Sequence, residues 1–172
     1  LVVTKATGAY SFTLLDNLAH ADANGENNLQ LPVFTVTGKD SDGDPASVTL
    51  TANVTDDIPV VTTSNESFTV DEDDLVDGTD SSKESLTATG TVADNVNWGA
   101  DGFNGITSVT AASGAPTTNH NGTTITLSTA QWQLVVTKAT GAYSFTLLDN
   151  LAHADANGEN NLQLPVFTVT GK

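Results

Sequence analysis

Hydrophobic and polar residues alternate with a period of two along much of this chain. The alternation is clearest in residues 47–54, where every second residue is valine, leucine or alanine, and it recurs at 10–14, 86–92 and 124–128. A period of two is typical of β-strands that have one buried and one solvated face. Because no segment shows a sustained helical period, the pattern predicts an all-β protein.

Glycine, asparagine and aspartate separate these predicted strands. Asn121-Gly122 is a two-residue hairpin signal, and Ala23-Asn24-Gly25 marks another turn. Several short strands divided by such turns are typical of an antiparallel β-sandwich. We therefore expect two antiparallel sheets packed on one core.

The first 39 residues of the chain return unchanged as the last 39. Residues 1–39 and 134–172 are identical at every position, which sets an offset of 133 residues. This period is the size of a whole domain, because solenoid repeats usually run about 20–50 residues. Identity over the whole stretch suggests recent duplication. The sequence therefore predicts a tandem array of near-identical domains.

The boundary between two repeats is predicted at Pro59/Val60, within a linker at about residues 55–61. Paired acids follow a clean strand there, and a proline, which lacks the N–H that a strand interior needs, comes next. Residues 1–59 are then the C-terminal part of one repeat, and residues 60–172 are most of the next.

These two parts are expected to be incomplete in complementary ways. By analogy with residues 1–59, residues 60–172 lack a final strand, the counterpart of residues 46–54. Residues 1–59 have that strand but lack their own N-terminal half. Because unpaired strands invite donation between molecules, we expect one molecule's fragment to complete the repeat of another, or the domain limits to differ from these.

The charge of the chain excludes several classes of partner. There are 21 acidic residues against 5 lysines and no arginine, for a formal net charge of −16. Nucleic acids and anionic membranes require positive charge on a protein that binds them, so neither is expected as a partner. No apolar run is long enough for insertion into a bilayer. Cysteine is absent, which excludes disulfides and thiolate sites.

Three acidic clusters are the candidate metal sites. Carboxylates at alternating positions, as in Asp40-Ser41-Asp42-Gly43-Asp44, converge if the backbone curls around a cation, and carboxylate oxygens suit Ca²⁺. The alternative for each cluster is a solvated acidic turn. The clusters can gather around one junction between domains. The predicted calcium ligands are Asp40, Asp42, Asp44, Asp56, Asp57, Asp71, Glu72, Asp73, Asp74 and Asp101.

Two further groups of polar residues are weaker candidates. Asp101, in Gly99-Ala100-Asp101-Gly102, is a weaker candidate than the three clusters. Asp22, Asn24 and Glu26 alternate in the same way as the first cluster, but a polar turn is the favoured interpretation for them.

Several short motifs follow one another in a characteristic order across nearly the whole chain. They are Gly25-Glu26-Asn27, Leu31-Pro32, Phe34-Thr35-Val36-Thr37, Asp40-Ser41-Asp42-Gly43-Asp44, Asp56-Asp57-Ile58-Pro59, Val70-Asp71-Glu72-Asp73-Asp74-Leu75 and Gly99-Ala100-Asp101-Gly102. Their order and spacing resemble the repeat domains of large RTX adhesins, giant surface proteins that Gram-negative bacteria export by type I secretion. One departure is Lys39, which stands where the family often has an acid and would weaken a nearby cation site. The glycine-rich nonapeptide of the family is also absent, as expected for an extender.

This resemblance implies an immunoglobulin-like β-sandwich that serves as an extender domain, with Ca²⁺ stiffening the joints between domains. The implied partners are the neighbouring repeats of the same chain. The implied location is extracellular, on the bacterial surface, in cell adhesion and biofilm formation. The linker Asp56-Asp57-Ile58-Pro59 is also similar to the calcium-dependent linkers of cadherins.

An enzyme is not expected from this sequence. His20 and His153 occupy the same repeat position, neither has a partner at metal-ligand spacing, and the acids lie in turns and linkers. The main alternative to an extender is a calcium-dependent glycan- or surface-binding module, in which Trp98 and Trp132 would stack on a sugar. Packing in the core is the favoured interpretation for both tryptophans.

Overall fold

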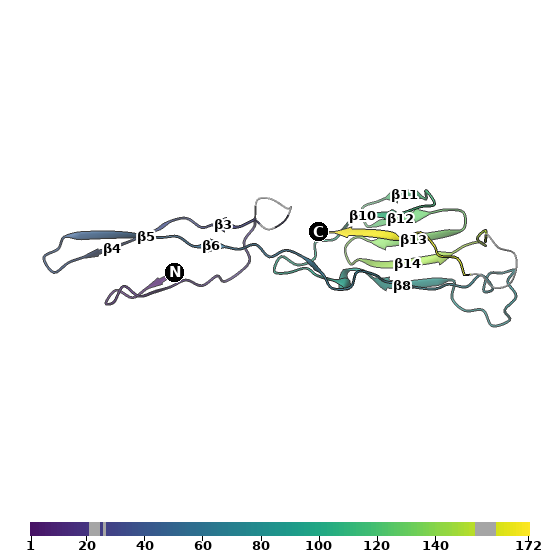
Figure 1. Ribbon diagram of the computed structural model, residues 1–172, viewed down its shortest axis with the longest axis horizontal. Helices are drawn as coiled ribbons and strands as arrows, with labels where there is room; N and C mark the ends of the chain where they lie inside the picture. The colour runs from purple at the N-terminus through teal and green to yellow at the C-terminus, as the bar shows by residue number, and fades with distance from the viewer. Residues whose placement is uncertain (21–24, 26, 154–160) are drawn as a thin grey trace. The chain divides into compact units, whose positions relative to one another are not determined.

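The computed structural model describes residues 1–172 apart from 21–24, 26 and 154–160 (Figure 1). The described residues form fifteen short strands and one 3-10 turn, η1 (Ala93–Asn95), so the prediction of an all-β protein is confirmed. Every strand pair is antiparallel. No helix of the described residues is long and apolar enough to cross a membrane.

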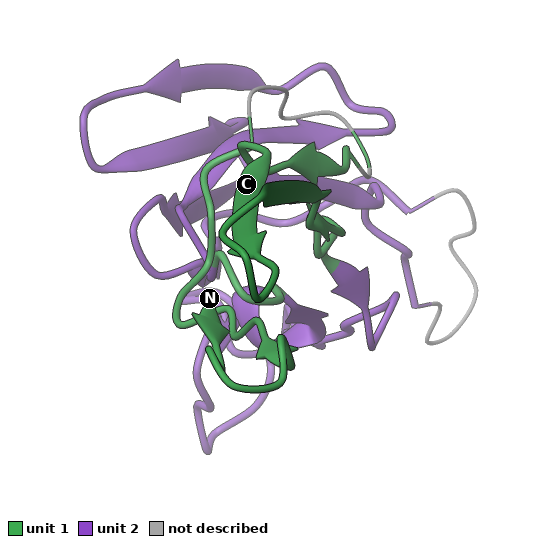
Figure 2. Cartoon of the chain, turned by 90° about the vertical axis from the view of Figure 1, so that its left-hand side faces the viewer, with its two compact units in different colours: residues 1–59, 98–101 green, residues 60–97, 102–172 purple. Residues whose placement is uncertain are grey.

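The chain divides into two compact units, coloured green and purple in Figure 2. Unit 1 comprises Leu1–Pro59 and Trp98–Asp101, and unit 2 comprises Val60–Asn97 and Gly102–Lys172. The first division falls between Pro59 and Val60, inside the linker indicated by the sequence. The assignment of Trp98–Asp101 to unit 1 differs from the prediction, which placed all of residues 60–172 together. The backbone therefore passes between the units at three places instead of one.

The larger sheet of unit 2 has five strands in the order β11-β12-β13-β14-β8. Asn121 supports the turn between β11 and β12, because its side-chain Oδ1 accepts the N–H groups of Thr123 and Thr124. The strands are β8 (Thr87–Thr91), β11 (Thr117–His120), β12 (Thr124–Ser128), β13 (Trp132–Thr137) and β14 (Ala142–Leu147).

Strands β10 (Ile106–Ala111) and β15 (Phe167–Gly171) pair with each other and form a second layer over this sheet. The core between the layers is aromatic at its centre. Phe145 is completely buried, and its ring centroid lies 4.9 Å from that of Phe68 and 5.9 Å from that of Trp132. Two antiparallel layers with one shared core are consistent with the predicted β-sandwich. The other buried core residues are Ile106, Val109, Ile125, Leu127, Leu134 and Val136.

The two ends of unit 2 carry different features. Strand β7 (Val60–Val61) pairs with β9 (Val96–Asn97) near the start of β14, where the Val92 N–H donates to the Gly141 carbonyl. The acidic loop, residues 71–84, precedes β8 and lies where β14 ends, since the Leu147 N–H donates to the Leu86 carbonyl. The length of the β8–β14 ladder therefore separates the acidic loop from the strand that follows the linker.

Unit 1 is built from three two-stranded pairs. They are β1 (Val2–Val3) with β2 (Tyr10–Ser11), β3 (Leu29–Gln30) with β6 (Asn53–Val54), and β4 (Phe34–Lys39) with β5 (Pro45–Leu50). None of its described large apolar side chains reaches full burial.

The repeated sequence forms the same hairpin in both units. Val2 pairs with Ser11 in unit 1, and their counterparts Val135 and Ser144 pair in unit 2 in the same register. The turn is also conserved between the copies, because Gly8 and Gly141 both have a positive φ, of 71° and 69°. Only glycine adopts this conformation without strain. The local sequence therefore specifies the hairpin independently of its surroundings.

Burial of the identical residues differs sharply between the two units. Phe12 is 38 % exposed, whereas its counterpart Phe145 is 0 % exposed, and Leu14 is 46 % exposed against 2 % for Leu147. The difference arises because β12 extends the sheet beside the repeated hairpin in unit 2, and β10, in the second layer, covers its apolar face. In unit 1, Phe12 contacts only one other aromatic ring among the described residues, that of Phe34 at 6.5 Å.

The identical residues provide a matched pair for mutation. Phe145→Ala should lower the free energy of unfolding of unit 2 by about 3–5 kcal/mol, because it opens a cavity in a closed core. Phe12→Ala removes the same atoms from a partly solvated site, so we expect less than about 1 kcal/mol. Chemical denaturation followed by tryptophan fluorescence measures both values, and equal losses would contradict the difference in burial.

Candidate metal-binding clusters

The turn between β4 and β5 brings together Asp40, Asp42 and Asp44. One carboxylate oxygen of each lies within 4.8 Å of the others, and all three residues are exposed. Oδ1 of Asp40 accepts the N–H groups of Gly43 and Asp44 at 2.9 and 2.8 Å, so this carboxylate also closes the turn. We call these three acids the hairpin-tip cluster.

The turn itself accounts for the ionised state of Asp40. A hydrogen bond with the Asp42 carboxyl lowers the pKa of Asp40, and the backbone N–H groups of Asp44, Gly43 and Asp42 lower it further. These donors stabilise the charged carboxylate without a metal. The hairpin-tip cluster could hold a cation through its remaining oxygens, but its geometry does not require one.

Asp56 lies at the centre of the second cluster, within unit 1. Its Oδ2 accepts the Asn27 N–H at 3.3 Å, and its Oδ1 lies 3.8 Å from Nε2 of His20. The side chains of Asp56 and His20 are only 10 % and 9 % exposed. Because the other ring nitrogen of His20 contacts the Asn27 carbonyl, that nitrogen carries the proton and donates. Asp56 is therefore held by several contacts close to the linker.

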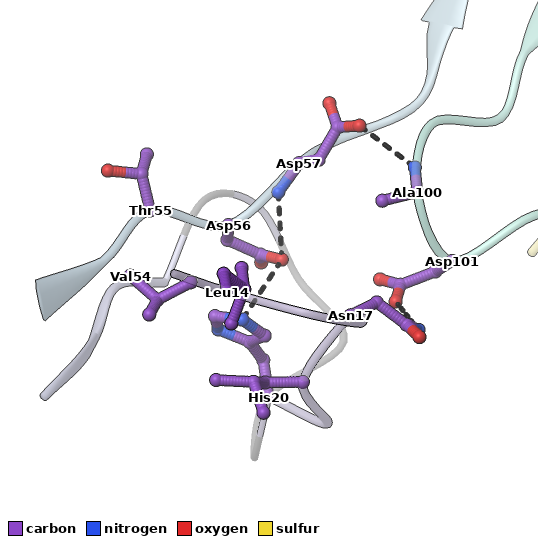
Figure 3. A pocket seen from close by; sticks show the side chains of 10 residues that line it. Leu14, Asn17, His20, Val54, Thr55, Asp56, Asp57, Ala100 and Asp101 are labelled. Carbon is purple, nitrogen blue, oxygen red and sulfur yellow. Dashed lines mark hydrogen bonds and ion pairs between the residues drawn. The ribbon is translucent and has the colours of Figure 1, made fainter. Parts of the chain in front are cut away.

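Asp57 and Asp101 join the segment Trp98–Asp101 to the rest of unit 1 (Figure 3). The Asp57 carboxylate accepts the Ala100 N–H at 2.9 Å, and Asn17 Nδ2 donates to Asp101 Oδ1 at 2.8 Å. Gly99 permits this approach, because a Cβ at its position would lie 2.7 Å from Asp57 Oδ2. Asp56, Asp57 and Asp101 thus line one site, which we call the linker cluster.

The linker cluster surrounds a small cavity of about 60 Å³. Pockets for small organic ligands usually have about 300–1,000 Å³, so this cavity is too small for a sugar ring. It has room for a cation or for water. The lining residues also include Leu14, Leu18, Val54 and Thr55.

The acidic loop of unit 2 forms the third cluster from Asp73, Asp74 and Asp80. Their carboxylate oxygens lie within 4.8 Å of one another, and Asp74 is only 6 % exposed. The loop is tightly folded, because a Cβ on Gly78 would lie 2.0 Å from the Asp73 carbonyl oxygen. Lys83 donates to that same carbonyl, so one positive charge already lies beside the loop.

Burial, hydrogen bonding and neighbouring charges in the acidic loop raise the pKa of two carboxyls. Burial, followed by the charges of Asp71, Asp74 and Asp80, raises the pKa of Asp73. A hydrogen bond with Asp74, followed by burial and the charge of Asp74, raises the pKa of Glu84. Both shifts favour the protonated form of these carboxyls, through burial, hydrogen bonding and the neighbouring negative charges.

Glu72 faces away from this group and toward the repeated segment. Its Oε1 accepts the Leu151 N–H at 2.5 Å, and its Oε2 lies 3.2 Å from Nε2 of His153. His153 and His20 have no acidic partner at metal-ligand spacing in the sequence, but each meets a carboxylate in space.

The structure places the predicted ligands in three separate groups. The hairpin-tip cluster lies at the tip of the β4–β5 hairpin, whereas the linker cluster follows β6 in unit 1. The acidic loop lies at the end of unit 2 away from β7. Within unit 1 the hairpin-tip cluster and the linker cluster lie apart, so these two do not share one junction there, whereas a junction that includes the acidic loop of unit 2 stays a prediction. Asp80 and Glu84 were missed by the sequence reasoning. Asp22, Asn24 and Glu26 lie outside the described residues.

Comparison with known proteins finds no match, since no family model, curated protein or solved structure is similar to this chain. Its function is therefore inferred from its own residues and their geometry.

The acidic loop fits calcium best among the three clusters. Ca²⁺ binds oxygens at about 2.3–2.6 Å, so two ligands of one ion can lie up to about 5 Å apart. The carboxylate oxygens of Asp73, Asp74 and Asp80 lie within 4.8 Å of one another and meet this limit, as do those of the hairpin-tip cluster. The donor set is also of the right kind, because a buried carboxylate lies among other acids and hard cations prefer oxygen.

Gly99 and Gly102 allow a test of the linker cluster. Both have a positive φ, of 72° and 73°, but only at Gly99 would a Cβ meet another residue. Gly99→Ala should break the bond between Asp57 and Ala100, and should speed hydrogen exchange of the Ala100 amide about tenfold, because bonds to charged groups contribute about 1.5–3 kcal/mol. Gly102→Ala carries the same backbone strain and should leave this exchange nearly unchanged. Equal effects in the two variants would contradict the proposed contact.

The pKa shifts predict opposite responses of the two units to pH. The raised pKa values of Asp73 and Glu84 mean that folded unit 2 binds protons more tightly than the unfolded chain, so its stability should fall as pH rises through these values. The lowered pKa of Asp40 acts in reverse, and its contribution in unit 1 should be lost as pH falls. Unfolding in chelator from about pH 3 to pH 7 measures both trends. In Asp73→Asn/Glu84→Gln the decline in unit 2 should flatten, and an unchanged slope would contradict this origin.

Proposed function

We propose that this protein is a structural extender repeat of a cell-surface adhesin, in which calcium stiffens the joints between successive domains. In this role it has no catalytic activity, acts outside the cell, and projects a distal binding domain away from the bacterial surface. Its direct partners are the neighbouring repeats of the same chain. The sequence repeat supports this proposal, because a domain-sized segment recurs without change and forms the same hairpin twice.

The observation that carries the proposal is that one repeated segment meets two acidic groups. In unit 1, Asn17 and His20 contact the linker cluster through Asp101 and Asp56. In unit 2, the copy of this segment contacts the acidic loop, through Leu151 and His153 on Glu72. Residues 17–20 and 150–153 are identical in sequence. In an array of complete domains, each copy of this segment would therefore contact both the linker cluster and the acidic loop. Each joint would then combine the acidic loop and linker cluster around residues 17–20.

The identity of residues 1–39 and 134–172 also places the hairpin-tip cluster at the opposite end of a domain. Lys172 lies beside Gly105, to whose carbonyl its N–H donates, and its counterpart Lys39 directly precedes Asp40. In an array, Asp40, Asp42 and Asp44 would therefore lie next to residues 102–105, at the end where the chain enters a domain. Acids from both neighbours would face each joint.

Calcium would convert this concentration of charge into stiffness. Uncompensated carboxylates from two domains repel one another, whereas a shared cation links them through short oxygen contacts. Freely jointed domains span a distance that grows only with about the square root of their number, so an extender requires stiff joints. Calcium is scarce in the cytosol and abundant outside, so stiffening would follow export.

Glycan binding is less well supported as a function. Trp132 is 4 % exposed in the core of unit 2, where its ring packs edge-on against Phe167 at 5.3 Å. Trp98 is half-buried within unit 1. The ring of Trp132 is therefore not available to stack on a sugar, and the cavity of the linker cluster is too small for one.

Calcium should stabilise unit 2 against unfolding through the acidic loop. With affinities of about 10⁻⁴ to 10⁻³ M, as in other extracellular modules, about 10 mM calcium should add about 1.4–2.7 kcal/mol per site relative to chelator. Asp74→Asn should remove most of this gain, because it keeps the acceptor for the Glu84 N–H but loses the charge. Asp77→Asn, at an exposed position of the same loop, is the matched control and should retain the gain. Thermal unfolding of all three proteins measures the effect.

Equal unfolding midpoints in calcium and chelator would contradict calcium binding. Stiffening requires a separate measurement on the same chain, namely the distance between one fluorophore in unit 1 and one in unit 2. The fluorophores can be attached at Ser47→Cys and Thr118→Cys, since the natural chain has no cysteine. Calcium should narrow the distribution of distances between them. If calcium shifts the unfolding midpoint but leaves the width of the distance distribution unchanged, the domain binds calcium but is not stiffened by it. That result would contradict the extender role.

A further inference from the structure

His20 contributes one ring nitrogen to the cavity of the linker cluster (Figure 3). Its Nδ1 donates a proton to the Asn27 carbonyl at 2.5 Å, so the neutral ring has a lone pair and no hydrogen at Nε2. No described residue donates a hydrogen bond to Nε2, and the side chain is only 9 % exposed. This lone pair, on a side chain that is nine-tenths buried, is therefore available to a ligand in the cavity.

Asp56 faces this nitrogen with a carboxylate oxygen. Oδ1 of Asp56 lies 3.8 Å from Nε2 of His20, and the Asp56 side chain is only 10 % exposed. A carboxylate oxygen is also an acceptor, so two acceptors face each other with no hydrogen between them. The distance also exceeds the range of about 2.7–3.2 Å for a hydrogen bond with a nitrogen donor. A direct bond between the two residues is therefore not the arrangement that this geometry favours.

The separation of the two acceptors indicates what can lie between them. A bridging water at about 2.8 Å from each acceptor, with a tetrahedral angle, requires a separation of about 4.5 Å. A zinc ion lies about 2.0–2.2 Å from nitrogen and oxygen ligands, so two of its ligands are about 3.3 Å apart at the tetrahedral angle and about 4.2 Å apart at most. The separation of 3.8 Å lies within the second interval, so a metal ion fits better than a water.

Asn27 holds both of these acceptors in place. Its carbonyl fixes the ring of His20, and its N–H donates to Oδ2 of Asp56 at 3.3 Å. Oδ1 of Asp56 also accepts the Asp57 N–H at 3.0 Å. Histidines that bind metals usually donate their other ring N–H to a carbonyl or carboxylate, which fixes the tautomer and the orientation of the ring. His20 and Asp56 therefore have the surroundings of metal ligands.

The identical histidine of unit 2 meets its carboxylate differently. Nε2 of His153 lies 3.2 Å from Oε2 of Glu72, which is within hydrogen-bond distance, and these side chains are 28 % and 30 % exposed. A direct bond joins this pair close to solvent. Only in unit 1 does the repeated histidine combine burial, a fixed tautomer and a carboxylate beyond hydrogen-bond distance.

We propose that Nε2 of His20 and Oδ1 of Asp56 bind a first-row transition-metal ion such as Zn²⁺ in the cavity of the linker cluster. Imidazole nitrogen suits these ions, whereas Ca²⁺ prefers oxygen ligands. No third acid or histidine of the described residues lies within ligand range of this pair, so water completes the coordination shell. The cavity of about 60 Å³ has room for this shell, because about 10–15 Å³ suffices for one water.

The ion joins two distant segments at the linker end of unit 1. His20 lies in the repeated segment, whereas Asp56 comes two residues after β6. Asp56 then serves a transition metal instead of calcium, and the acidic loop of unit 2 remains the calcium site. The two ions use different residues, so this proposal does not rest on the extender function.

Zinc titration of the natural chain tests the site. In excess calcium, isothermal titration calorimetry with zinc chloride should show one binding site per chain. His20→Ala and Asp56→Asn should each weaken this binding more than about tenfold, because each removes a ligand. Asp56→Asn keeps an oxygen acceptor for the Asn27 N–H, and slow hydrogen exchange of the Ala100 amide verifies that unit 1 is folded.

His153→Ala is the matched control, because it removes the same residue from the other copy of the repeated segment. It should bind zinc as tightly as the natural chain. Equal weakening in His20→Ala and His153→Ala would overturn the proposal, and so would a natural chain that binds no zinc.

Nuclear magnetic resonance of chain labelled with ¹⁵N-histidine identifies the ring atom without any substitution. Without metal at about pH 7.5, His20 should be neutral with its proton on Nδ1, and zinc should shift the Nε2 resonance while Nδ1 keeps the proton. A doubly protonated ring at this pH would show an ion pair with Asp56 and overturn the proposal. A zinc-induced shift at Nδ1 would overturn it as well.

Failure of this proposal can be told apart from failure of calcium binding. Asp74→Asn should retain zinc binding, and His20→Ala should retain the gain in the unfolding midpoint that calcium gives to unit 2. Loss of zinc binding in Asp74→Asn would place zinc in the acidic loop and contradict its assignment to His20 and Asp56.

Discussion

A strand segment with one apolar face stays partly in contact with water until a second layer covers that face. The repeated residues meet both situations within one chain. In residues 134–172, β12 extends the sheet, β10 lies in the layer that covers it and Phe145 is fully buried, whereas Phe12 remains partly solvated in residues 1–39. The hairpin register is the same in both. Local sequence therefore determines the hairpin, while the core depends on the strands that residues 60–133 contribute.

The alternation of apolar residues predicted the strands well, because successive side chains of a strand point to opposite faces and only one face is buried. Ile125 and Leu127 lie in the core as the pattern indicates, and residues 47–54 form β5 and β6 with a short break. The membership of Trp98–Asp101 in unit 1 could not be predicted in this way. It depends on the approach of Asp57 to Gly99 and Ala100, residues far apart in sequence, and alternation carries no information about such contacts.

The acidic clusters were predictable only where neighbouring residues form them. Asp40, Asp42 and Asp44 converge because a single turn closes around them. Asp80 was not found because an irregular loop separates it from Asp74, with no periodicity to fix which side chains meet. The orientation of Glu72 toward Leu151 likewise depends on the packing of the whole unit. Sequence therefore located the charge of the loop but not the set of oxygens that it brings together.

The return of Trp98–Asp101 to unit 1 has a mechanical consequence. A force that pulls on the chain cannot be taken up by the linker alone, because the backbone on both sides of this segment belongs to unit 2. Extension must first break the bonds of Ala100 to Asp57 and of Asp101 to Asn17. The chain at this connection therefore lengthens only after these two bonds have broken.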